Sequence, residues 1–145
     1  MPLDETRVIN GDFGEVWHEG VWMTQVTGAE ANVEISKEEV RRAGTRWRGF
    51  KSTSLSGSGT ISGYKVTSEW VERIGQIAND QRGAFKTELI IALKDPEAWG
   101  AYRVRLKNVT FDNIPLVNYE VGSLVEEEIP FTFVGFDLLD TFNEG

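Results

Sequence analysis

Residues 30–36 read EANVEIS, and this stretch decides the fold class because its apolar and polar side chains alternate. Val33 and Ile35 fall on one face of an extended chain, whereas Asn32 and Glu34 fall on the other. A period of two is typical of a strand with one buried face. The stretch therefore predicts a half-buried β-strand, and similar patterns recur along the chain.

Further strands are predicted on both sides of this stretch. Two of them are expected to form a hairpin around Glu19-Gly20, because glycine readily adopts the positive φ of a tight turn. The phase of the apolar side chains shifts near Asn108, which predicts a bulge, and Pro130 indicates a sheet edge or a second bulge. The predicted strands are residues 16–18, 21–27, 30–36, 60–66, 85–93, 102–114 and 126–139.

One amphipathic helix of about three turns is predicted. Ser68 is expected to be its N-cap, Glu69 lies in its first turn, and Gly83 follows its end. Its apolar stripe consists of Trp70, Val71, Ile74, Ile77 and Ala78, with Asn79 and Asp80 after it. The expected fold is mainly β: two packed antiparallel sheets, as a sandwich or an open barrel, with one flanking α-helix in a single domain of residues 1–145.

Composition is that of one globular domain. The chain has 145 residues, of which 40% are hydrophobic and 26% charged. It contains no cysteine, which excludes disulfides, thiol catalysis and thiolate metal sites. No stretch has the length of a membrane span and the first residues lack the apolar core of a secretory signal. We therefore expect a protein made in a cytoplasm, without stable membrane association.

Charge is distributed unevenly. The net charge is −8, yet residues 41–51, RRAGTRWRGFK, contain five basic residues and no acid. Glycine and serine continue to residue 59, so residues 41–59 are predicted to be a long interaction loop. Arginine and tryptophan favour protein contacts, and the acidic remainder of the chain disfavours the alternative of stacking on single-stranded nucleic acid. The candidate contact residues are Arg41, Arg42, Arg46, Trp47, Arg48, Phe50 and Lys51.

No motif indicates catalysis, a metal or a cofactor. His18 is the only histidine, no GxSxG motif is present, and we expect His18 to lie at a surface or an interface. The acid pairs Asp95/Glu97 and Asp137/Asp140 do not have the spacing of a calcium loop and are expected to be solvated acids beside turns.

Two further patterns are also better explained without chemistry. Glu126, Glu127 and Glu128 could serve a hydrolase only if they converged, but adjacent strand residues point to opposite faces. We interpret them as a charged surface. Residues 56–59, SGSG, precede a predicted strand rather than a helix, so they are not a phosphate loop.

Several segments, taken in order, resemble the tail tube proteins of contractile-tailed phages and phage-like particles. The segments are residues 9–11 (ING), 30–34 (EANVE), 49–53 (GFKST), 59–68 (GTISGYKVTS), 109–114 (VTFDNI) and 126–137 (EEEIPFTFVGFD). The resemblance implies two packed sheets with a flanking helix, a fold shared with type VI secretion tube proteins. It implies hexameric rings whose sheets join into one inner barrel, stacked into a tube inside a sheath.

The resemblance also implies partners and a location. The tube would work with tail sheath, tape-measure, baseplate and tail-terminator proteins, in a virion tail assembled in the host cytoplasm. It would carry DNA without binding it specifically, or perforate a membrane. Under this interpretation the loop of residues 41–57 reaches the adjacent ring, and Glu126, Glu127 and Glu128 belong to an acidic lumen or a partner patch. A sheath-facing helix surface would consist of Glu69, Glu72, Arg73 and Gln76.

Three alternatives remain open at this point. A type VI secretion tube protein would share the fold and the ring. A monomeric β-barrel could bind a small ligand at a mouth formed by Trp17, Trp22 and Trp47. A small acid–base hydrolase is disfavoured by the lack of catalytic motifs.

Overall fold

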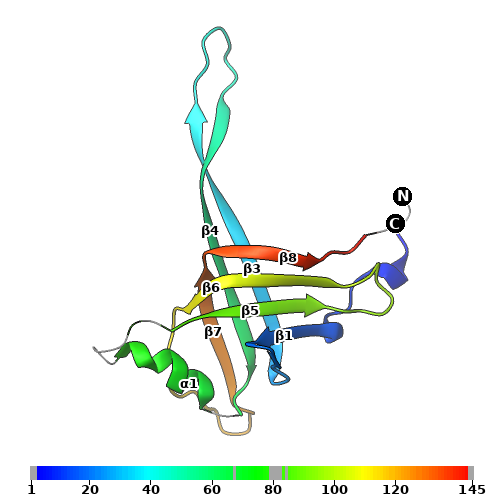
Figure 1. Ribbon diagram of the computed structural model, residues 1–145, viewed down its shortest axis with the longest axis vertical. Coiled ribbons are helices and arrows are strands. Elements are labelled where there is room, and N and C mark those ends of the chain that lie inside the picture. Colours follow the sequence, from blue (N-terminus) through cyan, green and yellow to red (C-terminus); the bar gives the residue numbers. More distant parts are fainter. Residues whose placement is uncertain (1–2, 67, 79–82, 84, 144–145) are drawn as a thin grey trace.

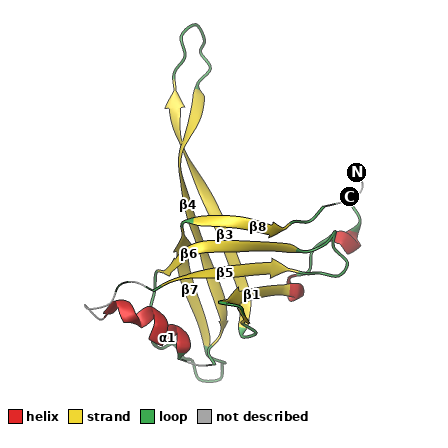
Figure 2. Ribbon diagram, in the orientation of Figure 1, coloured by secondary structure: helices red, strands yellow, loops and turns green. Residues whose placement is uncertain are grey.

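The computed structural model describes residues 3–66, 68–78, 83 and 85–143, and they form one antiparallel sheet with a short helical segment at one end (Figures 1 and 2). In the labels used here, η marks a 3-10 helix. The elements are η1 (Glu5–Arg7), η2 (Gly11–Phe13), β1 (Gly14–His18), β2 (Val21–Trp22), β3 (Val26–Val40), β4 (Gly49–Tyr64), α1 (Glu69–Ile74), η3 (Gly75–Ala78), β5 (Lys86–Leu93), β6 (Tyr102–Phe111), β7 (Glu126–Phe133) and β8 (Gly135–Asp140).

The sheet folds into two layers. Its strand order is β2-β1-β5-β6-β7-β4-β3, and β8 pairs with β6 beside β7. Figure 1 shows β3, β4 and β7 crossing β1, β5, β6 and β8 at a steep angle. A mainly β fold with antiparallel strands and a flanking helix is thus confirmed, but the two predicted sheets are two layers of one sheet. The layers are joined because β6 pairs at one end with Phe131 and Thr132 of β7 and over the rest of its length with β8.

The core lies between the layers and is closed at one end by the helix. Phe131, Leu89 and Val109 are fully buried there. Trp70 of α1 packs its ring 5.1 Å from the ring of His18 and 5.0 Å from that of Phe111. The remaining core side chains are Val16, Met23, Ile61, Ile74, Leu106, Ile129 and Phe133.

A long hairpin projects from this body (Figure 1). β3 and β4 pair from Val26↔Gly63 to Val40↔Gly49, whereas β7 accompanies β4 only from Gly57 to Tyr64. We call the part beyond β7, residues 34–56, the arm. Its eight β4 residues, 49–56, extend about 26 Å at roughly 3.3 Å per residue.

The arm corrects the predicted loop of residues 41–59. Residues 49–59 belong to β4, and only 41–48 connect the two strands. Serine and glycine there had suggested a flexible connection. Glycine is instead required because Gly57 and Gly59 lie opposite Phe133 and Phe131, whose rings occupy the space of a β-carbon.

Local predictions had mixed outcomes. The Glu19-Gly20 turn is confirmed, with φ of 52° and 82°, and so is the bulge at Asn108, with φ of 51° and a register shift opposite β5. β2 is much shorter than predicted. The predicted strand of residues 126–139 is two strands, because the chain leaves β4 at Val134 and turns to β6.

Pro130 lies in an internal strand rather than at a sheet edge. Its carbonyl accepts from the Asp112 amide, which follows the last residue of β6. A residue's N–H and C=O point to the same side of a strand, so the missing N–H of the proline faces the point where β6 has ended. The proline therefore costs no hydrogen bond to β4, which lies on the other side of β7.

The helix is shorter and less regular than predicted. Six α-helical residues are followed by four 3-10 residues, and the Ser68 side chain makes no capping hydrogen bond. Trp70 and Ile74 are buried as expected, whereas Ile77 is exposed. The predicted end at Asn79 and Asp80 lies outside the described residues. Within the described residues, no helix combines the length and the apolar character needed to cross a membrane.

Candidate assembly surfaces

All seven candidate contact residues lie together at the far end of the arm. Arg41 to Arg48 occupy the connection, and Phe50 and Lys51 are Cα partners of Glu39 and Glu38. Arg41 and Arg48 place their Nε atoms 3.6 and 3.2 Å from Oε1 of Glu39. The Trp47 side chain is 80% exposed. The arm tip is therefore a basic surface with an unburied aromatic side chain, typical of a protein contact.

A second surface lies on the face of β3, β4 and β7 that points away from the core. The register pairs Glu30 with Thr60 and Pro130, and Asn32 with Ser58 and Thr132. We call this surface the polar face, and it carries no basic side chain. It consists of Glu30, Asn32, Glu34, Ser56, Ser58, Thr60, Ser62, Glu126, Glu128 and Thr132.

The predicted acidic triplet is divided between the two faces of β7. Glu126 and Glu128 belong to the polar face and are exposed. Glu127 points to the core side, where its side chain is only 9% exposed and lies 3.4 Å from the Lys65 ammonium group. Alternation along the strand separates it from its neighbours, so Glu127 does not contribute to an acidic surface.

The helix residues predicted to face a sheath are largely engaged within the chain. Arg73 donates from Nη1 to Oε2 of Glu19 at 3.1 Å, which holds α1 against the β1–β2 turn. Gln76 donates to the Gly83 carbonyl. Glu72 is exposed, and the side chain of Glu69 is outside the described residues.

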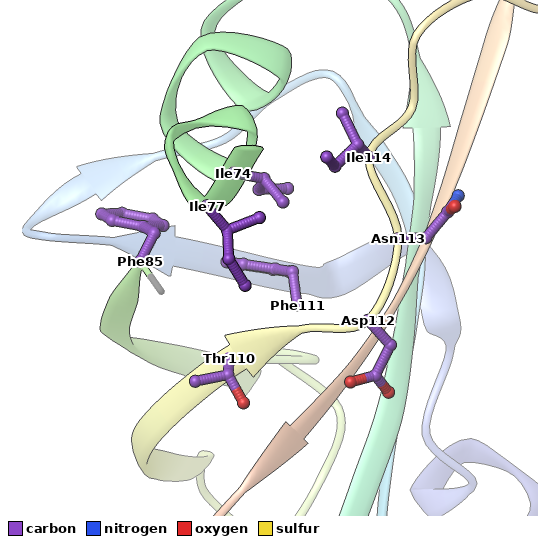
Figure 3. Close-up of a pocket in the computed structure, with 8 residues that line it drawn as sticks. All are labelled: Ile74, Ile77, Phe85, Thr110, Phe111, Asp112, Asn113 and Ile114. Carbon is purple, nitrogen blue, oxygen red and sulfur yellow. The ribbon is translucent and has the colours of Figure 1, made fainter. Parts of the chain in front are cut away.

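The cavity shown in Figure 3 does not have the form of a ligand site. It measures about 410 Å³ and lies between the helical segment and the ends of β5 and β6. Ile74, Ile77 and Phe111 point toward its interior, whereas the carboxylate of Asp112 and the amide of Asn113 point away (Figure 3). Ligand sites combine apolar walls with convergent polar groups, which this cavity lacks.

The tryptophans proposed for a barrel mouth are not assembled. Trp17 and Trp22 stack on each other with ring centroids 6.2 Å apart, on β1 and β2. Trp47 lies in the connection between β3 and β4, at the arm tip, and Figure 1 shows this tip far from β1. The ligand-binding barrel therefore lacks the mouth that was predicted for it.

Two predictions for polar side chains are wrong. His18 is 5% exposed rather than at a surface, and its ring contacts the rings of Trp70 and Phe85. Its Nε2 lies 2.9 Å from the hydroxyl oxygen of Thr87. Asp95 is buried because its carboxylate accepts from the amides of Asn10 and Glu97, joining η2 to the β5–β6 turn.

The second acid pair is not beside a turn. Asp137 lies in β8 and accepts from Arg105 and Lys107, and these hydrogen bonds, from Lys107 first, lower the pKa of its carboxyl. Across the described part of the chain, no group of three or more histidine, cysteine or acidic side chains is arranged to hold a metal.

Sequence reasoning missed one exposed apolar segment. We call residues 112–125, between β6 and β7, the base loop, and it has no helix or strand. The sequence feature that could have revealed this loop is the largely apolar stretch IPLVNYEVGSLV at 114–125, whose apolar residues recur with neither a helical nor a strand period. The exposed large side chains are Leu116, Val117, Tyr119, Val121 and Leu124.

Comparison with known proteins identifies relatives along almost the whole chain. A family model described as "Phage tail tube protein" matches residues 1–140. The phage-like element PBSX protein XkdM of Bacillus subtilis (strain 168) is 35% identical over 147 residues, which cover 98% of this chain and 100% of XkdM.

Solved structures share the fold at low sequence identity. One is a chain from the PVC sheath-tube complex, an extracellular contractile injection system in its extended state. It has a TM-score of 0.74 and 12% identity, with 97% of this chain and 99% of that chain covered. A chain from the tube terminating cap of the anti-feeding prophage has a TM-score of 0.71 and 14% identity, with 97% and 93% covered. At these identities the likeness establishes the fold alone.

Proposed function

The chain belongs to the phage tail tube protein family and is a structural subunit of a tail tube, and on this premise we propose that it forms hexameric rings stacked into a hollow conduit. The conduit lies inside a contractile sheath and serves DNA delivery or membrane perforation. The observation that carries the proposal is that the subunit has two contrasting surfaces. The polar face is acidic and has no basic side chains, whereas the tip of the projecting arm is basic. One face suits a channel wall, and the arm suits a contact between rings.

The polar face is proposed to line the channel. Glu30, Glu34, Glu126 and Glu128 supply its charge, and hydroxyl groups of serine and threonine occupy most of the remainder. Like charge repels the phosphate backbone of DNA, so a strand would pass without being held. Small side chains on β4 keep this wall smooth.

The position of this face can be tested with heavy-atom labels, because the chain contains no cysteine. Glu128→Cys places a thiol on the polar face, and Glu72→Cys places one on exposed α1 as the matched control. After labelling with a gold-maleimide cluster, tubes should show density along the axis for Glu128→Cys and at the periphery for Glu72→Cys. Density outside the tube wall for Glu128→Cys would contradict the assignment.

The arm is proposed to contact the neighbouring ring. It extends about 26 Å beyond β7, and its tip has five basic and two acidic side chains between Glu38 and Lys51. The rest of the subunit is strongly acidic, so opposite charges favour docking of the tip on another copy. Two different patches of one chain form this contact, and such contacts generate open stacks.

Shortening the arm separates folding from assembly. Lys37 and Ser52 are Cα partners, so residues 38–51 can be replaced by an Asn-Gly turn that closes the remaining hairpin. The variant should keep the circular dichroism spectrum and melting temperature of the wild type within a few degrees. It should form no tubes by negative-stain electron microscopy, and tubes of normal length would refute the role of the arm.

Other partners follow from the tube role and are also proposals. We assign sheath contact to the exposed side of α1 around Glu72, and end contacts to a tail-terminator and a baseplate protein. A tape-measure protein would occupy the lumen before contraction. The subunit would be assembled in the host cytoplasm and function as part of the tail of a virion or phage-like particle.

A further inference from the structure

An apolar groove lies in the angle between the arm and β8. It measures about 360 Å³ and is lined only by uncharged residues, including Val33 and Leu55 of the hairpin and Phe133 and Phe136 beyond it. Leu55 is 69% exposed, and Val33 and Phe136 are also exposed. These side chains continue the core-side face of the sheet past the point where the body ends. The groove is thus a piece of core surface without a cover in the isolated subunit.

The base loop offers apolar side chains of a matching kind at the other end of the molecule. Val121 is 94% exposed, and four more large apolar side chains of the loop are exposed with it. Both ends of the loop lie beside the end of β4 that is far from the arm, because Lys65 donates to Val125 through its amide and to Pro115 through its ammonium group. Loops of this length without secondary structure are uncommon in compact domains and usually functional.

The positions of these two surfaces fit a head-to-tail contact. Figure 1 shows the arm at one end of the long axis and the segment between β6 and β7 at the other. In an end-to-end arrangement of two copies, the base loop of the second copy would meet the angle at the root of the first arm. The arm would then lie alongside the second body, where the stretch of β4 paired with β7, from Gly57 to Tyr64, also spans about 26 Å.

We propose that the base loop of one subunit packs into the groove at the root of the arm of the next subunit along the tube. The occupant is a second copy because the chain itself carries both members of the pair, on different patches at opposite ends. Such a contact cannot close on two molecules, so it extends as an open stack. The proposal rests on the proposed tube function and adds to it a second pair of surfaces that join consecutive rings, apart from the arm tip.

Charged substitutions test the pair directly. Leu55→Lys and Val121→Asp each place one charge in the apolar contact, at positions exposed enough to leave the fold intact. Each alone should raise the protein concentration needed for tubes that sediment by about tenfold or more. The matched control is Leu3→Asp, also highly exposed but distant from both surfaces, which should assemble as the wild type does.

Mixing the two variants gives a sharper outcome. In a head-to-tail stack of alternating copies, the groove altered by Leu55→Lys meets the loop altered by Val121→Asp at one junction, where the two introduced charges are opposite. At the next junction the native groove meets the native loop. A mixture, or the double variant in one chain, should therefore recover tube formation that each single variant lacks. Single variants that assemble like Leu3→Asp, or a mixture that stays unassembled, would overturn the proposal.

Disulfide trapping provides a readout that separates this contact from the tube itself. The chain has no cysteine, so Leu55→Cys with Val121→Cys in one chain should give a covalent ladder under mild oxidation, while each single cysteine gives mainly monomer. Tubes without a ladder would overturn the contact and leave the tube function standing. Neither tubes nor a ladder at any concentration would overturn both.

Discussion

Replacing glycines of β4 with alanine should destabilise the fold in a defined order. A β-carbon at Gly59 would meet the Glu30 carbonyl oxygen and would lie 2.6 Å from the Phe131 ring and 3.0 Å from the Ala31 Cα. Two of these three atoms are backbone, and the ring is fully buried, so the neighbours cannot move aside. Overpacking of this kind typically costs about 1–3 kcal/mol, and we expect the upper part of that range.

Gly57→Ala should cost less. All three nearest atoms are in the ring of Phe133, which borders the open groove and can shift without moving the backbone. We expect about 1 kcal/mol. Gly75→Ala is the control, because a β-carbon there meets nothing within 4 Å and the backbone is already right-handed helical, with φ −63°. It should be neutral or stabilising by up to about 1 kcal/mol.

Thermal unfolding monitored by circular dichroism, with urea denaturation on the same samples, measures this order. At roughly 2–4 °C per kcal/mol for a domain of this size, Gly59→Ala should lower Tm by about 4–12 °C and Gly57→Ala by a few degrees. Phe133→Leu in the Gly57→Ala background should recover part of its loss but should not rescue Gly59→Ala. If Gly59→Ala has the same Tm as Gly75→Ala, β4 does not pack on its neighbouring strands as closely as described.

Three further outcomes follow from other contacts. Thr87→Val removes the hydroxyl that lies 2.9 Å from Nε2 of buried His18 and should cost about 1 kcal/mol by urea titration; unchanged stability would mean that this hydrogen bond is not formed. Asp137→Asn should lower Tm at pH 7. Hydrogen bonds from Lys107 and Arg105 hold the pKa of Asp137 below its ordinary 3.8. The stability that the ionised carboxylate contributes is therefore present above pH 3.8 and is lost as the pH falls through the lowered pKa, so the Tm–pH curves of wild type and Asp137→Asn should converge in acid. A constant difference in Tm between the two proteins would contradict the ion pairs. Trp47→Ala should leave Tm unchanged and weaken tube formation, and full assembly would remove Trp47 from the ring contact.

The sequence predicted what depends on local alternation and missed what depends on distant strands. The period of two from Ala31 to Ile35 correctly placed a strand, but the predicted half-burial is wrong for the single subunit, where Val33 and Ile35 are exposed. Serine and glycine at 52–59 have no such pattern, and their strand character depends on β3 and on the rings of Phe131 and Phe133, more than 70 residues away.

The candidate surfaces were predicted to a similar degree. The basic tip was visible as an uninterrupted run of charge, and the hairpin brings its seven residues together. The polar face could not be predicted from the sequence, because Glu30 and Glu34 lie beside Glu126 and Glu128 only through the register of β3, β4 and β7. His18 is buried because Trp70 of α1 and Phe85, directly before β5, pack against its ring. The sequence of the short strand that contains His18 gives no indication of these contacts.

β3 is the last strand of the sheet, and its 15 residues present a long row of backbone hydrogen-bonding groups on one side. An exposed edge of that length invites pairing between molecules in arbitrary registers. The strand carries Glu30, Glu34, Lys37, Glu38 and Glu39, and such charges penalise casual edge-to-edge association. We therefore expect these charges to keep free subunits from pairing through this edge at random, which leaves the edge available for a partner in one defined register.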